Sequence, residues 1–153
     1  MSRVQLALNV ADLDSAVEFY GRLFGTEPAK RRPGYANFAV ADPPLKLVLI
    51  EGMGAPGSLN HLGVEVADAE AVANATDRLA AEGMATSAED AVTCCYALQD
   101  KVWVDAPDGE PWEIYTVLAD AGATDDPADL GCDLDNRCCA IQEPVGVASE
   151  PCC

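Results

Sequence analysis

The chain has 153 residues, half of them apolar, so it can fold around a hydrophobic core of its own. Its 26 acidic residues outnumber 9 lysines and arginines, and a formal charge of −17 excludes proteins that bind nucleic acid or anionic membranes by electrostatic attraction. The first residues lack the basic and apolar regions of a secretory signal, and no apolar run could cross a membrane, so we expect a cytoplasmic protein with reduced thiols.

The first third of the chain alternates apolar runs with turn signals. Residues 4–10 (VQLALNV) predict a strand, and residues 12–24 predict a helix with Asp12 as its N-cap and Gly25 as its stop. Strand-like runs follow at 29–32, 35–40 and 45–51, separated by turns at 33–34 and 42–44. A glycine-rich connector over 52–58 comes next.

The same order of elements then recurs. Residues 61–66 (HLGVEV) predict a strand and 68–81 a helix that Asp68 caps and Gly83 ends; strand-like runs near 85–97, 101–105 and 111–118 follow, with a hairpin turn at 107–109. Residues 4–12 can be laid over residues 60–68, which places Gln5 on His61 and Asp12 on Asp68. We interpret this as an internal duplication.

The predicted fold is therefore α+β. Two β-α-β-β-β modules, at about 1–52 and 59–119, form paired curved sheets in one domain over residues 1–119. From residue 120 onward the composition turns to Asp, Gly and Ala without an apolar period, which predicts a mobile tail over 120–153. A monomer and a homodimer are both compatible with this organisation.

Three polar side chains are candidates for a metal site. Gln5 and His61 occupy equivalent positions in the two modules, so a pseudo-twofold arrangement directs both toward its axis. Glu113 is the best-placed carboxylate, because Trp112 and Ile114 would face the other side of its strand. This N/O triad leaves coordination positions open, suits Fe(II), Mn(II), Co(II), Ni(II) or Zn(II), and most suggests Fe(II) oxygen chemistry. The alternative is that His61 is a hydrogen-bonded structural residue and Gln5 binds nothing.

The cysteines are the other unusual feature, since six of the seven form adjacent pairs. Adjacent cysteines bond to each other only through a strained ring, so ligation of a soft metal or metalloid is a better explanation than a disulfide framework. The tail thiols either capture a soft metal or metalloid and pass it on, or are incidental. The pairs are Cys94-Cys95, Cys138-Cys139 and Cys152-Cys153, and Cys132 is the seventh.

These motifs resemble the vicinal oxygen chelate superfamily, which includes glyoxalase I, extradiol dioxygenases and the fosfomycin and bleomycin resistance proteins. Residues 4–25, 61–68 and 106–115 (APDGEPWEIY) carry the resemblance, which covers about residues 3–118. The segment 93–97 (TCCYA) followed by 100–104 (DKVWV), with Gln5 where most members place a ligand histidine, resembles more narrowly the C–As lyases. Those are non-haem Fe(II) dioxygenases that demethylate trivalent organoarsenicals, and such sequences are also often labelled cadmium-induced proteins.

The resemblance implies that Gln5, His61 and Glu113 bind iron and that Cys94-Cys95 binds arsenic. Fe(II) is the expected cofactor, with Ni, Co, Mn or Zn as substitutes, and a trivalent organoarsenical such as methylarsenite and O2 are the expected partners. Two thiolates would displace the exchangeable oxygens of methylarsenite and fix the direction of its As–CH3 bond for oxidative cleavage to arsenite.

The thiol pair also makes a structural demand. Neighbours on a regular strand point to opposite faces, so residues 87–98 are predicted to be a loop or distorted edge that is mobile before substrate arrives and closes on it. Lys101 is expected to lower the pKa of the thiols or to contact a substrate anion, and otherwise to be solvated. The rival functions are a non-enzymatic cadmium- or arsenite-binding protein and an antibiotic-resistance protein of the same fold, which has no need of adjacent thiols.

Overall fold

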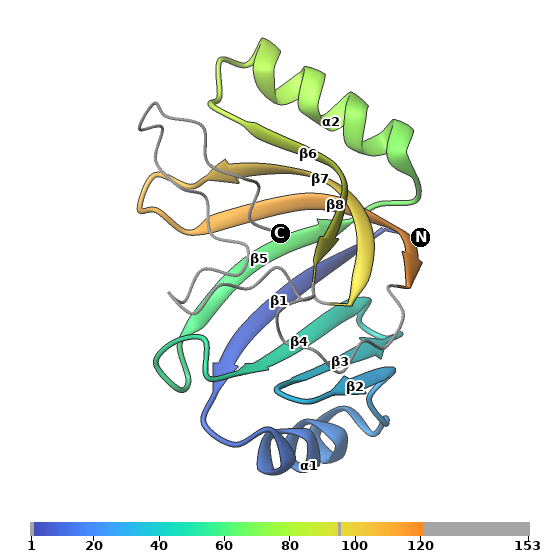
Figure 1. Ribbon diagram of the computed structural model, residues 1–153, viewed down its shortest axis with the longest axis vertical. Helices are drawn as coiled ribbons and strands as arrows, with labels where there is room; N and C mark the ends of the chain where they lie inside the picture. The colour runs from blue at the N-terminus through green and yellow to red at the C-terminus, as the bar shows by residue number, and fades with distance from the viewer. Residues whose placement is uncertain (1, 95, 121–153) are drawn as a thin grey trace. The chain divides into compact units, whose positions relative to one another are not determined.

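The computed structural model describes residues 2–94 and 96–120 (Figure 1). These residues divide after Glu65 into two compact units. Each unit is described by itself. Cys95 and nearly all of the predicted tail, with its five cysteines, lie outside the described residues. The domain limit near residue 119 and the mobility of the tail therefore stay predictions.

The first unit is a twisted sheet covered on one face by a helix. Its strands lie side by side in the order β2-β3-β4-β1-β5, with β1 parallel to β4 and antiparallel to β5. The elements are β1 (Arg3–Val10), α1 (Leu13–Phe24), β2 (Lys30–Arg32), β3 (Tyr35–Val40), β4 (Leu45–Glu51) and β5 (Leu59–Glu65).

Helix α1 begins and ends where its caps predict. Asp12 is extended, and its side chain accepts a hydrogen bond from the Ser15 N–H at 2.7 Å. Gly25, at φ 62°, adopts the left-handed conformation that ends the helix. Leu13 and Val17 point inward onto a core that includes Phe38, Leu47 and Leu49. The leucines of β4 (Leu45, Leu47 and Leu49) thus face α1, and the residues between them face the other way.

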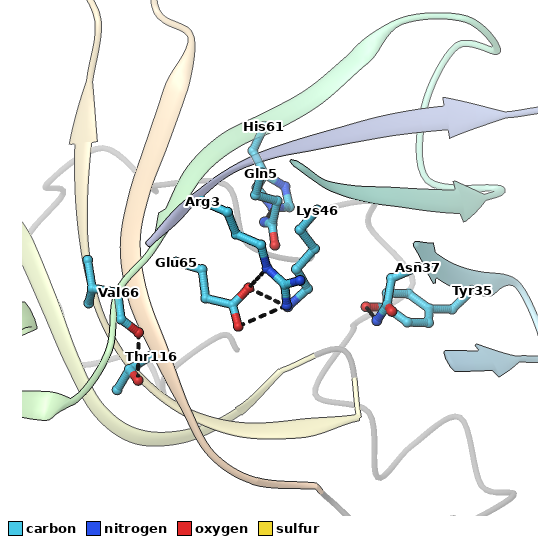
Figure 2. Close-up of polar contacts among 9 residues, drawn as sticks. All are labelled: Arg3, Gln5, Tyr35, Asn37, Lys46, His61, Glu65, Val66 and Thr116. Atoms are coloured by element: carbon cyan, nitrogen blue, oxygen red, sulfur yellow. Dashed lines mark hydrogen bonds and ion pairs between the residues drawn. The ribbon is translucent and has the colours of Figure 1, made fainter. Parts of the chain in front are cut away.

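The second unit repeats this plan with fewer strands. Strands β6 (Ser87–Cys94), β7 (Ala97–Asp105) and β8 (Pro111–Asp120) lie in the order β8-β7-β6, antiparallel throughout, and helix α2 (Ala69–Ala81) packs through Val72 and Leu79 against Val102. The Val66 N–H donates to the Tyr115 carbonyl at 2.8 Å, and the Thr116 hydroxyl donates to the Val66 carbonyl at 3.2 Å (Figure 2).

The order of elements confirms the α+β class and the two β-α-β-β-β modules. The predicted limits of two strands are wrong: β6 ends at Cys94, where it pairs with Ala97, and β7 starts at Ala97 instead of residue 101. Asp100 explains the difference, because this polar residue interrupts the apolar pattern yet accepts a hydrogen bond from the Ala91 N–H across the pair at 2.8 Å. Neither described helix is long and apolar enough to span a membrane.

The cap of α1 makes part of the stability depend on pH. The hydrogen bonds to Ser15 hold the pKa of Asp12 below its ordinary value of 3.8. A carboxyl with a lowered folded pKa stabilises the fold above its unfolded pKa, and this stabilisation is lost as the pH falls through the folded value. We expect Asp12→Asn to remove this part of the acid sensitivity. Urea unfolding of both proteins between about pH 7 and pH 2 should show their difference in unfolding free energy shrinking below about pH 4; a difference independent of pH would contradict the role of the charge.

Candidate functional site

The pairing of β1 with β5 reproduces the sequence duplication in three dimensions. The Cα partners include Gln5↔Gly63, Leu6↔Leu62 and Ala7↔His61. Residues 5 and 61 are equivalent in the duplication, and so are residues 7 and 63, so the first and third pairs are the same pair viewed from the two strands. A local twofold axis therefore passes by the Leu6–Leu62 pair, and Gln5 and His61 are diagonal neighbours on one face of the sheet.

Gln5 and His61 meet on that face. Both are 3% exposed, and Nε2 of Gln5 lies 2.9 Å from Nε2 of His61 (Figure 2). The other ring nitrogen, Nδ1, lies 2.7 Å from Oδ1 of Asn60. The structure thus brings together two of the three predicted ligands. Nε2 of His61 faces the Gln5 amide, and Nδ1 faces Asn60. Their role as ligands stays a prediction.

Charged side chains surround this contact within the first unit, and the sequence-based search missed them. Lys46, the parallel-strand partner of Gln5, is 8% exposed, and its Nζ lies 3.9 Å from Oε2 of Glu65. Arg3 holds the same carboxylate, with Nε at 2.7 Å and Nη2 at 3.3 Å (Figure 2). Strand alternation could have revealed Lys46 as a residue of this face. It stands between two leucines that face α1, so its side chain must point to the opposite face.

Asn37 and Tyr35 extend this polar face along β3. The Asn37 amide donates to the Tyr35 hydroxyl at 2.9 Å (Figure 2). Both side chains are buried. The face of the sheet opposite α1 therefore carries several buried polar groups among buried apolar side chains such as Val48 and Ile50. Burial of this many polar groups carries a desolvation cost, which marks the face as a candidate site.

Glu113 lies in the second unit, on the face of β8 opposite α2. It is 3% exposed, and its Oε2 lies 3.3 Å from Nζ of Lys101. Its neighbour Ile114 packs on the α2 side, so Glu113 faces away from it as alternation predicts. Lys101 is 1% exposed and its Nζ lies 5.4 Å from the centre of the Trp103 ring, so the expectation of a solvated lysine is wrong. Its observed neighbour is the carboxylate.

Glu89 lies on the same face of the second unit. Its Oε2 accepts a hydrogen bond from Nε1 of Trp103 at 3.4 Å. Burial raises the pKa of Glu89, while the positive charge of Lys101 and the bond from Trp103 oppose the rise. Lys101 therefore interacts with two carboxylates, the buried Glu113 and the half-buried Glu89, and the three groups have the character of a functional site more than of a packing core.

The strand that leads to the thiols is distorted. β6 is the edge strand of its unit, its register shifts between Glu89 and Val92, and Ala91 has φ 51°. After Cys94, Tyr96 has φ 68°, a left-handed conformation that is uncommon for a bulky residue. Of the two forms predicted, the structure has the distorted edge. The Cys94 side chain and Cys95 lie outside the described residues, so thiol geometry and closure stay predictions.

The donor set fits a divalent metal in its chemistry. In the described part of the chain, no three histidine, cysteine, aspartate or glutamate side chains gather as a ready metal site. A centre built on His61 therefore needs an amide oxygen, and Gln5 supplies one if its amide turns to present Oε1. Imidazole nitrogen with amide and carboxylate oxygen is a set that first-row divalent metals accept.

Comparison with known proteins agrees with this architecture. Residues 3–114 match the Glyoxalase/Bleomycin resistance protein/Dioxygenase superfamily. The chain is 59% identical to a trivalent organoarsenical cleaving enzyme of Thermomonospora curvata over 133 residues, which cover 86% of this chain and 88% of the relative. It is 56% identical to the cadmium-induced protein CadI of Mycobacterium tuberculosis over 151 residues, 97% of this chain and 99% of the relative.

Solved structures agree with the fold alone. The 2,3-dioxygenase LapB of Pseudomonas sp. KL28 superimposes with a TM-score of 0.61 at 20% identity, over 78% of this chain and 42% of that one. The Mn(II)-bound glyoxalase of Novosphingobium aromaticivorans gives 0.57 at 20% identity, over 86% and 45%. With the matched residues spanning both modules, this chain belongs to the glyoxalase/bleomycin resistance protein/dioxygenase superfamily, as its motifs indicated.

Proposed function

We propose that this protein is an Fe(II)-dependent C–As lyase that converts trivalent organoarsenicals such as methylarsenite to arsenite. The observation that carries the proposal is the buried contact of Gln5 with His61 beside the local twofold axis. A glutamine at this position agrees with the C–As lyase pattern, and the relatives called organoarsenical cleaving enzymes support the same activity. Detoxification of arsenic in the cytoplasm is the corresponding biological role.

In this proposal Gln5, His61 and Glu113 hold the metal. Fe(II), when bound there, supplies the one-electron chemistry with O2 that the protein's own side chains lack. The burial of all three side chains keeps bulk water from these donors. Ni, Co, Mn and Zn share the preference for such donors and are expected to occupy the same site without supporting turnover equally well.

Cys94 and Cys95 hold the substrate. Their thiols displace the two hydroxyl groups of methylarsenite as two molecules of water, leaving arsenic on two sulfurs and its methyl group directed one way. Oxidation by O2 then breaks the C–As bond, and one oxygen atom ends on carbon, at the level of formaldehyde, and the other on arsenic. Two water molecules replace the two sulfurs, so arsenite leaves and both thiols are restored. Arsenic stays trivalent, so the electrons that O2 accepts come from the methyl carbon.

We assign Lys101 to Glu113 rather than to the thiols or a substrate anion. The distance of 3.3 Å between Nζ and Oε2 and the near-complete burial of both residues support this role. A cation beside one carboxylate oxygen offsets part of the hydration that the carboxylate loses on burial and fixes its orientation. Lys101 is then a positioning residue.

A second function has one specific observation in its favour. One relative that matches 97% of the chain, at 56% identity, is named a cadmium-induced protein. A non-enzymatic cadmium- or arsenite-binding protein would use the tail thiols as much as the pair at 94–95 and would retain its metal without turnover. An antibiotic-resistance function is supported only by the superfamily and leaves the adjacent thiols unexplained.

The proposed activity predicts arsenite from methylarsenite only when both Fe(II) and O2 are supplied. The purified protein is loaded with Fe(II) without oxygen, mixed with methylarsenite and then exposed to air, and arsenic species are separated and quantified. Protein loaded with Zn(II) and protein kept anaerobic are the controls. Recovery of unchanged methylarsenite from the aerated Fe(II) protein would rule out the proposed C–As lyase activity. The non-enzymatic metal-binding function would then be the remaining hypothesis.

The thiol pair is expected to act on the substrate and not on the metal. Cys94→Ser and Cys95→Ser should each lower turnover by at least about 100-fold, because a single sulfur no longer fixes the As–CH3 direction, while iron content stays equal to that of the parent. Cys138→Ser/Cys139→Ser is the matched control and should retain activity. Loss of iron from either single variant would place that thiol on the metal; loss of arsenic binding from the control would favour the sequestering function.

The ion pair in the second unit predicts a stability effect without any substrate. Lys101→Met should lower the free energy of unfolding by about 3–5 kcal/mol, because it removes the cation beside a buried carboxylate. Adding Glu113→Gln should recover a large part of this loss, since the neutral amide does not need the charge. Urea unfolding of the metal-free single and double variants measures both values. Equal stability of parent and Lys101→Met would show that Lys101 has another role.

A further inference from the structure

We infer that a hydrogen-bond relay holds His61 in the tautomer with its proton on Nδ1, and that Ser58, Asn9 and Asn60 are positioning residues for this imidazole. The value of that tautomer rests on the proposed function, in which His61 binds a metal through Nε2. The relay itself lies wholly within the first unit. It starts at the backbone carbonyl of Ala55.

The relay is a continuous chain of short contacts. The Ser58 hydroxyl donates to the Ala55 carbonyl at 2.6 Å, and the Asn9 amide Nδ2 donates to Ser58 Oγ at 2.9 Å. The Asn60 amide Nδ2 donates to Asn9 Oδ1 at 3.0 Å, and Asn60 Oδ1 faces Nδ1 of His61 at 2.7 Å. Nε2 of His61 then faces the Gln5 amide nitrogen at 2.9 Å.

The direction of the relay follows from its start. A carbonyl oxygen only accepts hydrogen bonds, so Ser58 donates its single hydroxyl proton to the Ala55 carbonyl. Its Oγ must therefore accept the hydrogen bond from Asn9. Asn9 therefore presents its oxygen to Asn60, and Asn60 presents its own oxygen to the histidine ring. An oxygen at 2.7 Å from Nδ1 requires a proton on that nitrogen. Nε2 then carries no proton and keeps its lone pair. Nε2 is therefore the nitrogen that can bind a metal in this tautomer.

The backbone is arranged to build this relay. The register of β1 with β5 shifts between Ala7 and Leu8, because Ala7 pairs with His61 and Leu8 with Leu59. Asn60 is the additional residue of this bulge. In a regular strand Asn60 and His61 would point to opposite faces, and a bulge is the irregularity that re-aims a side chain. Asn60 can thereby contact Asn9 and the imidazole together.

The loop before β5 holds Asn9 in place. The Asn9 N–H donates to the Ser58 carbonyl at 2.9 Å, and the Gly57 N–H donates to the Asn9 carbonyl at 2.8 Å. Asn9 is 4% exposed, and a Cβ placed on Gly54 would lie 2.6 Å from Nδ2 of Asn9. Only glycine lets the loop approach the Asn9 amide this closely. This contact explains why a glycine stands at position 54 of the connector.

A reversed relay would have the opposite effect on the metal site. If Ser58 donated to Asn9 instead, both amides would turn and present Nδ2 to the imidazole, which would then carry its proton on Nε2. That proton occupies the position a metal needs. The bond to the Ala55 carbonyl favours one of these two patterns, as outer-shell partners of ligand histidines commonly do.

The tautomer can be read directly because His61 is the only histidine. Long-range ¹H–¹⁵N spectra of metal-free protein at mildly alkaline pH, labelled at the imidazole nitrogens, distinguish a proton on Nδ1 from one on Nε2. The parent and Ser58→Thr, which keeps the hydroxyl, should show Nδ1–H. Ser58→Ala and Gly54→Ala should shift the population toward Nε2–H, the first through the lost anchor and the second through displacement of Asn9.

Metal affinity separates the relay from the proposed function. Titration with Co(II), followed by its visible spectrum, should show affinity about 10–100-fold weaker in Ser58→Ala than in Ser58→Thr. A parent protein with its proton on Nε2, or an unchanged tautomer in both Ser58→Ala and Gly54→Ala, would overturn the relay. If the tautomer shifts as expected but the parent binds no metal, the relay stands and the metal-dependent function fails.

Discussion

The antiparallel register of β1 against β5 is the constraint on which the rest of the first unit depends. It places the Leu6–Leu62 pair beside the local axis and sends Gln5 and His61 to the face opposite α1. Because side chains alternate along a strand, a slip of one residue would carry both polar groups onto the helix side and expose their apolar neighbours. The hydrophobic packing of Leu47 and Leu49 under α1 therefore also secures the position of the histidine.

In each unit, a carboxylate on the face that the helix does not cover lies beside a positively charged side chain. Each unit places a carboxylate there, half-buried in Glu65 and buried in Glu113, and each provides cations beside it: Lys46 and Arg3 for Glu65 in one unit, Lys101 for Glu113 in the other. A buried carboxylate without a cation would lose several kcal/mol of hydration, so such pairs are needed before the face can hold charge at all. Pairing of this kind leaves a polar surface that can receive a ligand without collapse of the fold.

The sequence allowed accurate prediction wherever a local signal existed. The caps Asp12 and Gly25, the strands over 35–40 and 45–51, and the meeting of Gln5 with His61 all followed from periodicity or from the duplication. The turn at Tyr96 could not be predicted, because its left-handed backbone is carried by a residue with no preference for it. The relay to His61 was missed because it depends on a bulge and on the return path of a loop, which single residues do not encode.

The residues proposed to bind the metal and those proposed to bind arsenic lie in different structural settings. The proposed metal donors, Gln5, His61 and Glu113, stand on paired strands, with His61 beside the bulge of β5, and amide or ammonium partners limit their motion. The proposed arsenic donors, Cys94 and Cys95, come where the bulged edge strand β6 ends, and the backbone leaves regular geometry at Ala91 before them and at Tyr96 after them. A metal site gains from rigid, pre-oriented ligands, whereas a thiol pair that must close on arsenic needs backbone freedom. This difference between the two segments agrees with the proposed function, in which the metal is held in place and the substrate is captured.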